Sequence, residues 1–484
     1  MGVEPSRCRE STGSTRSKPQ SPTGISVRPW IASSGSKTAP SSAAEPQELS
    51  MSLVRSLRIV IDTVNVGSLF ELDDGRSYFR FDEAYAMMPE AERPVLSQAF
   101  EAETEAQTRS QLLDPALEET RGDGKRGLPP FFENLLPEGR LRRQLVEMAD
   151  IEERDSLGLL AYCGSDLPGN VQAVQETLTE QELGRLLTQG NDSFEMSSAQ
   201  MPAPESTSIS GVQPKVALVR EPGGRYVMRS KNNGGHYIGK LPASDFPQMP
   251  EVEHASLSLA RAAGVTTCEH ELLPLTEIAG QLHEAMREDS TRFLLVHRFD
   301  RDASTPNGRL HAEDMAQVTS TLPQNKYSLS YADLGLVLLA RSTSGEDDVH
   351  ELLRRLTVNE LLGNPDAHLK NFGLLYTTPR TAALSPAYDI VAYSAWNGST
   401  GHGLKLVDGI KAREISPAVV RQWANHWDLP EAALSKTITE TVDAAMRTWE
   451  GVLTAATLTD QHRARIWDHV RATKLAARWL KRHG

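Results

Sequence analysis

The sequence is poor in cysteine, with three residues among 484: Cys8, Cys163 and Cys268. Their wide separation gives neither a metal-binding pattern nor a disulfide framework, so we expect a reducing cytoplasm as the compartment. The chain also lacks an apolar run of about 18 residues, which a membrane-spanning helix requires, so no membrane span is expected. A positive net charge is missing too, because the formal net charge of the chain at pH 7 is −13. This charge argues against wrapping nucleic acid nonspecifically, although a local basic patch is compatible with it.

Large apolar side chains are scarce in the first fifty residues, where "ESTGSTRSKPQSPTGIS" and "ASSGSKTAPSSAAEP" are rich in serine, proline and glycine. Such a segment cannot bury enough surface to offset its chain entropy, and it lacks the apolar stretch of a secretory signal. We therefore expect residues 1–50 to form a disordered tail, or to result from a translation start placed too early. In the second case Met51 is the natural beginning, because strand-like sequence follows it.

The remaining sequence predicts three consecutive units, in a chain long enough for two to four domains. Residues 51–185 open with alternating apolar residues, at Ile59, Ile61 and Val64 and again in "RSYFRFD", which indicate strands. Helical spacing of apolar residues from about Glu138 to Ala149 adds a helix. We therefore predict an N-terminal α/β subdomain, followed over residues 190–207 by a polar, proline-containing linker or loop.

Residues 186–298 combine strand signals with one helix. "VALVR" and "RYVMRS" flank "EPGG" and predict a hairpin, and "HYIGKLP" predicts a third strand. "PEVEHASLSLARAAGV" has a proline start, early acids and Gly264 at its end, which are helix signals, and "RFLLVHRF" predicts a further strand. The order strand, strand, strand, helix, strand is the layout of a kinase small lobe.

Residues 299–484 are predicted to be a mostly helical C-terminal lobe, so the chain as a whole is α+β. "VHELLRRLTVNELLGN" places Val349, Leu352, Leu353 and Leu356 on one face of a helix. The C-terminal "RARIWDHVRATKLAARWLKRHG" predicts one basic amphipathic helix. We interpret its charged face as solvated, in preference to a contact with a partner or nucleic acid.

Polar residues that suit phosphoryl transfer gather in "LLGNPDAHLKNFGLL". That reaction needs a base at the nucleophile, oxygen ligands for magnesium, a cation for the phosphates and a cradle of backbone amides. Asp366 and Asn371 have the D-x4-N spacing of a kinase catalytic loop, and they are the candidate base and first Mg²⁺ ligand. Asp389, 23 residues after Asp366 and beyond the predicted strand "FGLLY", is the candidate second ligand. His368 and Lys370 can meet phosphate oxygens. The alternative is a capped loop, with Asp366 at a helix start and Asn371 in a turn.

The candidate cation is Lys240 in "HYIGKLP", with Glu253 on the following helix as its partner, although Glu251 lies only two residues away. The alternative is a surface lysine that extends its ammonium group into water. The candidate cradle is "STSISGVQPK", residues 206–215, which carries Gly211 and Lys215 but no G-x-G-x-x-G motif. A serine-rich surface loop is the alternative for that segment.

The segment "LHAEDMAQV" contains His311, Glu313 and Asp314 and could suggest a metal site. Their spacing matches no zinc motif. We interpret the segment as a helix N-terminus with acids in its first turn, where they stabilise the helix dipole.

Taken together and in this order, the blocks resemble the HipA family of serine/threonine-kinase toxins from bacterial toxin–antitoxin modules. The blocks are "FFENLLPEGRLRRQLVE" with "RDSLGLLAY", "SISGVQPKVAL", "HYIGKLP", "EVEHASLSLARAAGV", "LLVHRFDR", "HAEDMAQV", "GNPDAHLKNFGLL" and "LSPAYDIV", within residues 55 to about 440. The resemblance implies a protein-kinase-like two-lobed fold with an extra N-terminal subdomain packed on the small lobe. The tail before Met51 has no counterpart in the family.

The resemblance also implies roles for particular residues. Asp366 looks like the catalytic base, Asn371 and Asp389 like the Mg²⁺ ligands, and Lys240 like the ATP-phosphate lysine. The further ATP-binding positions are Ser210, Gly211, Val212, Gln213 and Lys215 in the phosphate loop, His297 and Phe299 in the hinge, and His368, Lys370 and Tyr388 around the catalytic loop. His297 stands where the common hinge has glutamate, but only backbone atoms are needed there. Pro214 replaces the acid often seen in this loop.

The family implies a switch as well, in which a loop serine is autophosphorylated and the kinase is shut off. Alignment on Gly211 places that serine at Ser208, with Ser210 as the alternative. A dianionic phosphate there would pair with nearby cations and draw the loop out of its ATP-cradling form.

The implied targets are aminoacyl-tRNA synthetases, phosphorylated on a serine so that translation stops and growth slows. The implied partner is a HipB-like helix-turn-helix antitoxin, through which DNA would mainly be contacted. Two other functions are open at this point. One is a phosphatidylinositol-kinase-like enzyme, because D-x-H-x-x-N also resembles that catalytic loop; the "SISGVQPK" block and the lack of a membrane-binding stretch argue against it. The other is a catalytically silent corepressor, against which the intact candidate residues argue.

Overall fold

The computed structural model describes residues 55–188, 213–228, 235–243, 245–279, 291–305, 307–396 and 401–483. The chain divides into the units Met1–Glu48 and Leu49–Gly484, and all described residues belong to the second unit. The proposed tail and the predicted linker 190–207 therefore lie outside the described residues. No helix in the described ranges is both long and apolar enough to span a bilayer.

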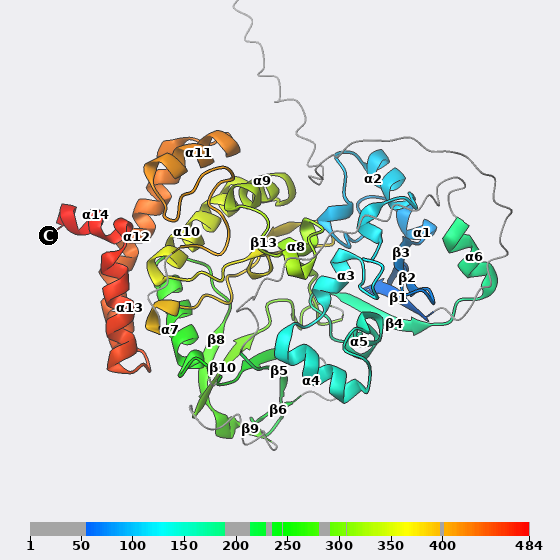
Figure 1. Ribbon diagram of the computed structural model, residues 1–484, viewed down its shortest axis with the longest axis horizontal. Coiled ribbons are helices and arrows are strands. Elements are labelled where there is room, and N and C mark those ends of the chain that lie inside the picture. Colours follow the sequence, from blue (N-terminus) through cyan, green and yellow to red (C-terminus); the bar gives the residue numbers. More distant parts are fainter. Residues whose placement is uncertain are drawn as a thin grey trace, which may run out of the picture. The chain divides into compact units, whose positions relative to one another are not determined.

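The N-terminal subdomain, described over residues 55–188, is built on a four-stranded antiparallel sheet of order β3-β2-β1-β4 (Figure 1). The predicted strands and the predicted helix are confirmed, and Ile59 and Ile61 face the buried side of the sheet. The elements are β1 Arg55–Ile61, β2 Val64–Glu71, β3 Ser77–Phe81, α1 Glu83–Ala86, α2 Glu105–Leu112, α3 Pro130–Leu135, α4 Gly139–Ala149, α5 Ser156–Cys163, β4 Val171–Glu176 and α6 Glu180–Thr188.

The small lobe carries a six-stranded sheet of order β8-β10-β7-β5-β6-β9, with one helix packed against it. The elements are β5 Lys215–Arg220, β6 Tyr226–Met228, β7 Tyr237–Lys240, α7 Met249–Ala262, β8 His270–Pro274, β9 Ile278–Ala279 and β10 Arg292–His297. The predicted hairpin is confirmed, because Leu218 pairs with Met228 in antiparallel register. The predicted strand order missed both edge strands, β8 and β9. The sequence of β8, "HELLP", is short and ends in proline, which is a weak strand signal, and β9 has only two residues.

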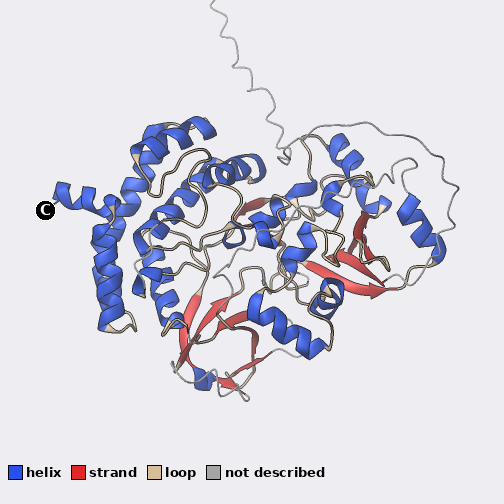
Figure 2. Ribbon diagram, viewed as in Figure 1, coloured by secondary structure: helices blue, strands red, loops and turns tan. Residues whose placement is uncertain are grey.

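The lobe after residue 298 is mostly helical, as predicted (Figure 2). Its elements are β11 Ala312–Asp314, α8 Met315–Val318, α9 Tyr331–Arg341, α10 Glu346–Leu362, β12 Gly373–Tyr376, β13 Ala382–Leu384, α11 Pro417–Trp427, α12 Glu431–Ala455, α13 Asp460–Ala472 and α14 Lys474–His483. The apolar face predicted on α10 is fully buried. Its residues join the main core together with the inner faces of α7 and α12.

Two sequence interpretations in this lobe can be compared with the structure. The prediction of a single C-terminal helix was wrong, because the segment is divided into α13 and α14. The break lies at Thr473, whose backbone is extended and whose hydroxyl accepts a hydrogen bond from the amide of Ala476. The helix start in "HAEDMAQV" is confirmed, since Asp314 caps α8 and forms a capping box with Gln317. Glu313 belongs to β11 instead of the first helical turn.

Candidate functional site

Those predicted site residues that the structure describes surround one cavity of about 670 Å³, which is lined by all three parts of the second unit. The small lobe contributes Gln213, Lys215, Lys240, Glu253 and His297. The helical lobe contributes Phe299, Asp366, His368, Lys370, Asn371, Tyr388 and Asp389. The N-terminal subdomain contributes residues of α4 and the loop before it, including Glu138. A cavity of this size, mostly apolar with a few convergent polar groups, has the form of a small-molecule site.

Lys240 lies between two carboxylates, Glu253 on α7 and Asp389 on the loop after β13, and its ammonium group contacts both. Asp389 also accepts from Lys215, with 3.3 Å between its Oδ2 and the lysine Nζ. The sheet explains this convergence, because Lys215 and Lys240 are direct partners in the antiparallel register of β5 and β7. Of the two acids considered as partners of Lys240, the structure pairs it with Glu253.

The charges in this group are unequally stabilised. Burial raises the pKa of the Glu253 carboxyl, and the attraction of Lys240 does not fully offset it. Burial acts in the same direction on Asp389, but Lys215 and Lys240 outweigh it and hold the pKa of that carboxyl far below its ordinary value. The negative charge of the group is therefore held most firmly at Asp389. That residue has φ +53°, an uncommon left-handed conformation that aspartate tolerates better than most residues.

Asp366 follows the end of α10, where Gly363 adopts φ +66° and lets the chain turn away from the helix. Its amide donates to Asn364 Oδ1 over 3.1 Å, and its Oδ1 accepts from the Tyr327 hydroxyl over 2.5 Å. Burial raises the pKa of the Asp366 carboxyl, and the hydrogen bond from Tyr327 only partly opposes this. A carboxyl with a raised pKa that lies in a cavity is suited to accept a proton.

Asn371 ends the 3-10 turn Leu369–Asn371 and lines the same cavity. Its side-chain Oδ1 is buried and has no hydrogen-bond partner among the described residues. A buried carbonyl oxygen without a donor is costly unless a ligand satisfies it. No cluster of three or more His, Cys, Asp or Glu side chains with metal-binding geometry occurs within the described ranges. One amide oxygen with one carboxylate is, however, a set that Mg²⁺ accepts together with phosphate and water.

Lys370 and Lys326 meet at a single carboxylate, that of Glu138. The distances from Glu138 are 3.0 Å to Lys370 Nζ and 2.8 Å to Lys326 Nζ. Lys370 also donates to the main-chain oxygen of Asn134 over 3.0 Å. The two ammonium groups lower the pKa of Glu138 to about 2, although burial opposes them. His368 is buried beside this group, and burial lowers its pKa to about 3, so its ring is neutral at pH 7.

The predicted hinge connects β10 to the helical lobe. His297 donates its amide to the main-chain oxygen of Glu269 over 2.9 Å, and its ring packs edge-on against Tyr237. Phe299 lies against Tyr388, with 5.7 Å between the ring centroids. The Tyr388 hydroxyl donates to the main-chain oxygen of Lys370 over 2.9 Å. The predicted hinge is thereby connected through two aromatic side chains to the segment that contains Asp366 and Asn371.

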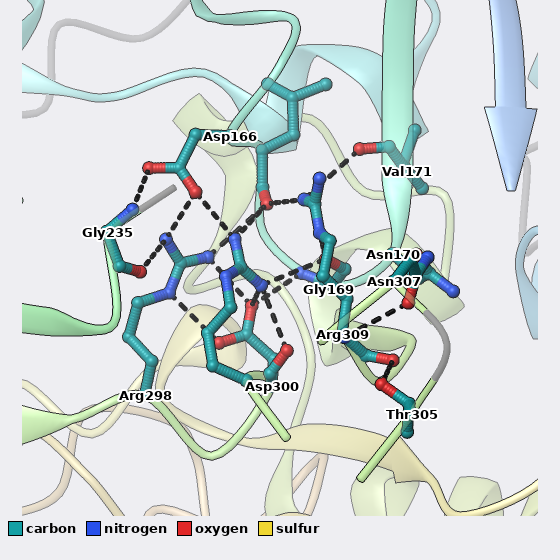
Figure 3. Close-up of polar contacts among 12 residues, drawn as sticks. Asp166, Gly169, Asn170, Val171, Gly235, Arg298, Asp300, Thr305, Asn307 and Arg309 are labelled. Carbon is teal, nitrogen blue, oxygen red and sulfur yellow. Dashed lines mark hydrogen bonds and ion pairs between the residues drawn. The ribbon is translucent and has the colours of Figure 1, made fainter. Parts of the chain in front are cut away.

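An arginine cluster fixes the chain just after the hinge to the N-terminal subdomain (Figure 3). Asp166 accepts from Arg298 over 3.0 Å and from Arg301 over 2.7 Å, and Asp300 accepts from both arginines over 2.8 Å. Arg309 donates to main-chain oxygens of the 165–171 loop, including that of Leu167 over 2.6 Å. All five side chains are largely buried. We call these residues the arginine cluster.

Four of the predicted site residues, Ser208, Ser210, Gly211 and Val212, lie outside the described residues. Sequence reasoning did not include Glu138, Lys326 or Tyr327 among the site residues. The only local signal for Glu138 was its position at the N-cap of the predicted helix that became α4. Lys326 and Tyr327 occur in "PQNKYS", a stretch with no motif of its own.

The sheet with its single packed helix, the helical lobe and the cavity between them define a protein-kinase-like fold with an added N-terminal subdomain. Comparison with protein-family models identifies the family of this chain. The HipA N-terminal domain matches residues 57–174, and the HipA-like C-terminal domain matches residues 207–449. The chain belongs to the HipA family.

Individual relatives agree with this assignment. A Sinorhizobium fredii chain named "Putative kinase Y4dM" is 33% identical over 391 residues, which are 80% of this chain and 89% of the relative. A second chain from that organism, "Putative kinase Y4mE", is 28% identical over 56% of this chain and 66% of its own length. Among solved structures, a chain of the Shewanella oneidensis MR-1 complex of HipA, HipB and operator DNA has the same fold. It gives a TM-score of 0.62 at 18% identity and covers 88% of this chain and 97% of that one.

Proposed function

We propose that the chain is an ATP- and Mg²⁺-dependent serine/threonine-protein kinase of the HipA type. The observation that carries this proposal is the convergence of Lys240, Asp366, Asn371 and Asp389 on one cavity, with Glu253 paired to the lysine. These are the parts that phosphoryl transfer requires, and they come from separate stretches of the chain. The kinase names of the relatives support the same class of reaction.

Mg²⁺ and ATP fit the residues that are present. Asn371 Oδ1 is a buried oxygen that needs a partner, and Asp389 is a carboxylate held in its charged form, so these two would hold the metal. Lys240 would pair with phosphate oxygens, with Lys215 and Gln213 at the start of β5 beside it. Ser210, Gly211 and Val212 would complete the phosphate loop. His297 and Phe299 would line the adenine end, with Tyr388 behind the phenyl ring.

When bound, Mg-ATP supplies the phosphoryl group that is transferred. Asp366 accepts the proton of the acceptor hydroxyl as the hydroxyl oxygen forms its bond to the γ-phosphorus, and the bond from that phosphorus to the β–γ bridging oxygen breaks. Tyr327 holds Oδ1 of Asp366 and so fixes the direction of the carboxylate. Lys240 balances negative charge on the phosphates, and Glu253 keeps the lysine in place.

The acceptor that we propose is a serine of another protein, in the first place an aminoacyl-tRNA synthetase, so that translation and growth are inhibited. Ser208, with Ser210 as the alternative, would be phosphorylated in the chain itself and act as the off-switch. A HipB-like helix-turn-helix antitoxin is the proposed partner, and the presence of HipB and operator DNA in the Shewanella complex supports it. The proposed compartment is the cytoplasm.

The proposal is tested by expressing the wild type, Asp366→Asn and the control Asp408→Asn, whose carboxyl is exposed. Growth and transfer of labelled phosphate from ATP are measured. We expect Asp366→Asn to remove both activities while the control keeps them. Equal toxicity and equal labelling of Asp366→Asn and wild type would reject the assignment of Asp366.

Two further experiments address the target and the switch. Phosphoproteomics after induction identifies the target protein. Ser208→Ala followed by mass spectrometry tests the off-switch, and phosphate found only on Ser210 would assign the switch to that residue instead.

A further inference from the structure

The N-terminal subdomain contributes a carboxylate to the candidate site itself. Glu138, at the N-cap of α4, lines the cavity and bridges Lys326 and Lys370 of the helical lobe. For Lys370, Glu138 is the nearer carboxylate, because Asp314 lies farther away, at 3.9 Å. The two lysine side chains are 4% and 14% exposed, so water can replace this carboxylate only in part.

Each lysine is the sequence neighbour of a residue that takes part in the proposed chemistry. Lys370 immediately precedes Asn371, the proposed metal ligand. Lys326 immediately precedes Tyr327, whose hydroxyl holds the carboxylate of Asp366. The main chain connects the same two segments, because the amide of Leu369 donates to the main-chain oxygen of Lys326 over 3.2 Å. Glu138 is thus connected to Asn371 through one contact, with Lys370, and to Asp366 through two, Glu138 with Lys326 and Tyr327 with Asp366.

We propose that Glu138 is a positioning residue of the phosphotransfer site, through which the N-terminal subdomain fixes the segment from Asp366 to Asn371. The inference rests on the proposed kinase function. Glu138 holds Lys370 and Lys326 side by side, and without its charge the two buried ammonium groups repel each other. The segment that each lysine belongs to then loses its fixed position, and the catalytic carboxylate and the metal-ligand amide move with it.

Glu138 does not act by binding the nucleotide. Its negative charge would oppose phosphate, and both its oxygens are already engaged by lysines. The positioning role therefore predicts different effects on kcat and on the Kd for the nucleotide. Replacing the carboxylate lowers the rate of the chemical step and leaves the affinity for metal-free ATP nearly as it was, because that affinity does not depend on the amide of Asn371.

The experiment compares wild type, Glu138→Gln, Lys370→Gln and the double variant. Glu147→Gln, an exposed position on the same helix, is the matched control. Labelled phosphate transfer to the chain itself and to casein gives kcat, and calorimetry with ATP in the absence of Mg²⁺ gives Kd. We expect Glu138→Gln to lower kcat by about ten- to a hundredfold, the size of a lost charge-assisted hydrogen bond. We expect Kd to stay within about twofold, since only uniform binding would alter it.

Because Glu138 acts through Lys370, the double variant is expected to lose much less activity than the product of the two single losses. Fully multiplicative losses, an unchanged kcat, or a Kd for metal-free ATP that changes tenfold would each overturn the inference.

Hydrogen exchange of the full-length chains provides a readout that does not depend on activity. We expect the amides of residues 364–373 to exchange faster in Glu138→Gln, while those of α12 stay protected as in wild type. Unchanged exchange in residues 364–373 would overturn the positioning role even if the enzyme is active. A wild-type protein that transfers no label would instead reject the proposed function, and with it the catalytic part of this inference.

Discussion

The arginine cluster predicts a large and specific loss of stability on the substitution Asp166→Asn. Asp166 is 3% exposed and accepts hydrogen bonds from Arg298, Arg301 and the amide of Gly235. Asparagine has nearly the same shape but no charge, so the change removes an electrostatic partner and creates no cavity. Its effect therefore combines the lost charge with one lost acceptor, because both carboxylate oxygens accept hydrogen bonds and the amide nitrogen of asparagine cannot.

The size of the loss follows from the burial of the partners. The cluster contains three arginines and two aspartates, so the substitution changes its net charge from +1 to +2 in a region where water has little access. Removing one partner of a buried ion pair costs about 3–5 kcal/mol of unfolding free energy. Asp300 still accepts from both Arg298 and Arg301, and its pKa is lowered to about 2 by them in spite of burial. We therefore expect the lower end, about 3 kcal/mol.

The assay is urea unfolding followed by circular dichroism, with Glu431→Gln as the control. Glu431 forms an ion pair of similar length with Arg421, 3.2 Å, but the two side chains are 41% and 63% exposed. Exposed pairs contribute about 0–1 kcal/mol, so the control is expected to change little. Equal losses in the two variants would refute the argument that burial decides the value of these pairs. So would a loss below about 1 kcal/mol for Asp166→Asn.

Three further predictions follow. Glu253→Gln is expected to lower phosphotransfer by about ten- to a hundredfold, since Lys240 then keeps only Asp389 as a partner; single-turnover labelling checks this, and a wild-type rate would reject the pair. Mg²⁺ without nucleotide is expected to bind weakly, because Lys215 and Lys240 already neutralise Asp389; calorimetry with and without a nonhydrolysable ATP analogue checks this. Burial raises the pKa of Glu313 to about 7, so the folded state holds its proton up to higher pH than the unfolded state. Stability from this group falls as the pH rises from about 4.5 to 7, and relative to Glu313→Gln the wild type should lose about 2.5 kcal/mol between pH 5 and pH 8 in urea titrations.

The strands and helices of this chain could be predicted where local pattern and core packing agree. The hairpin of β5 and β6 has its turn residues in "EPGG", and α7 has its proline, its early acid and Gly264, so neighbours in sequence decide the structure. The failures at β8 and at the C-terminal helix have the same origin. Strand β8 is formed because β10 offers it an edge, and α13 ends at Thr473 because α14 packs elsewhere, on α12. Neither cause lies within the segment concerned.

The candidate site also contains residues that could be predicted from local sequence and residues that could not. Asp366 and Asn371 are recognisable because five positions of one loop set their spacing. Glu138 and Lys370 are 232 residues apart, and no pattern in either segment indicates the other. Their contact exists only because the N-terminal subdomain packs beside the catalytic-loop segment. Contacts of this kind, between side chains far apart in sequence, are therefore the part of the site that a single sequence does not reveal.

Asp389 shows that the structure can alter the interpretation of a residue that the sequence identified correctly as part of the cavity. Its spacing predicts a metal ligand, yet its carboxylate contacts two lysines. With Glu253 included, two ammonium groups and two carboxylates make a neutral group in the core of the site. A cation that binds Asp389 must draw it away from Lys215 and Lys240, which then need other anions. The phosphates of a nucleotide are such anions, so the same contacts that weaken metal binding alone favour metal and nucleotide binding together.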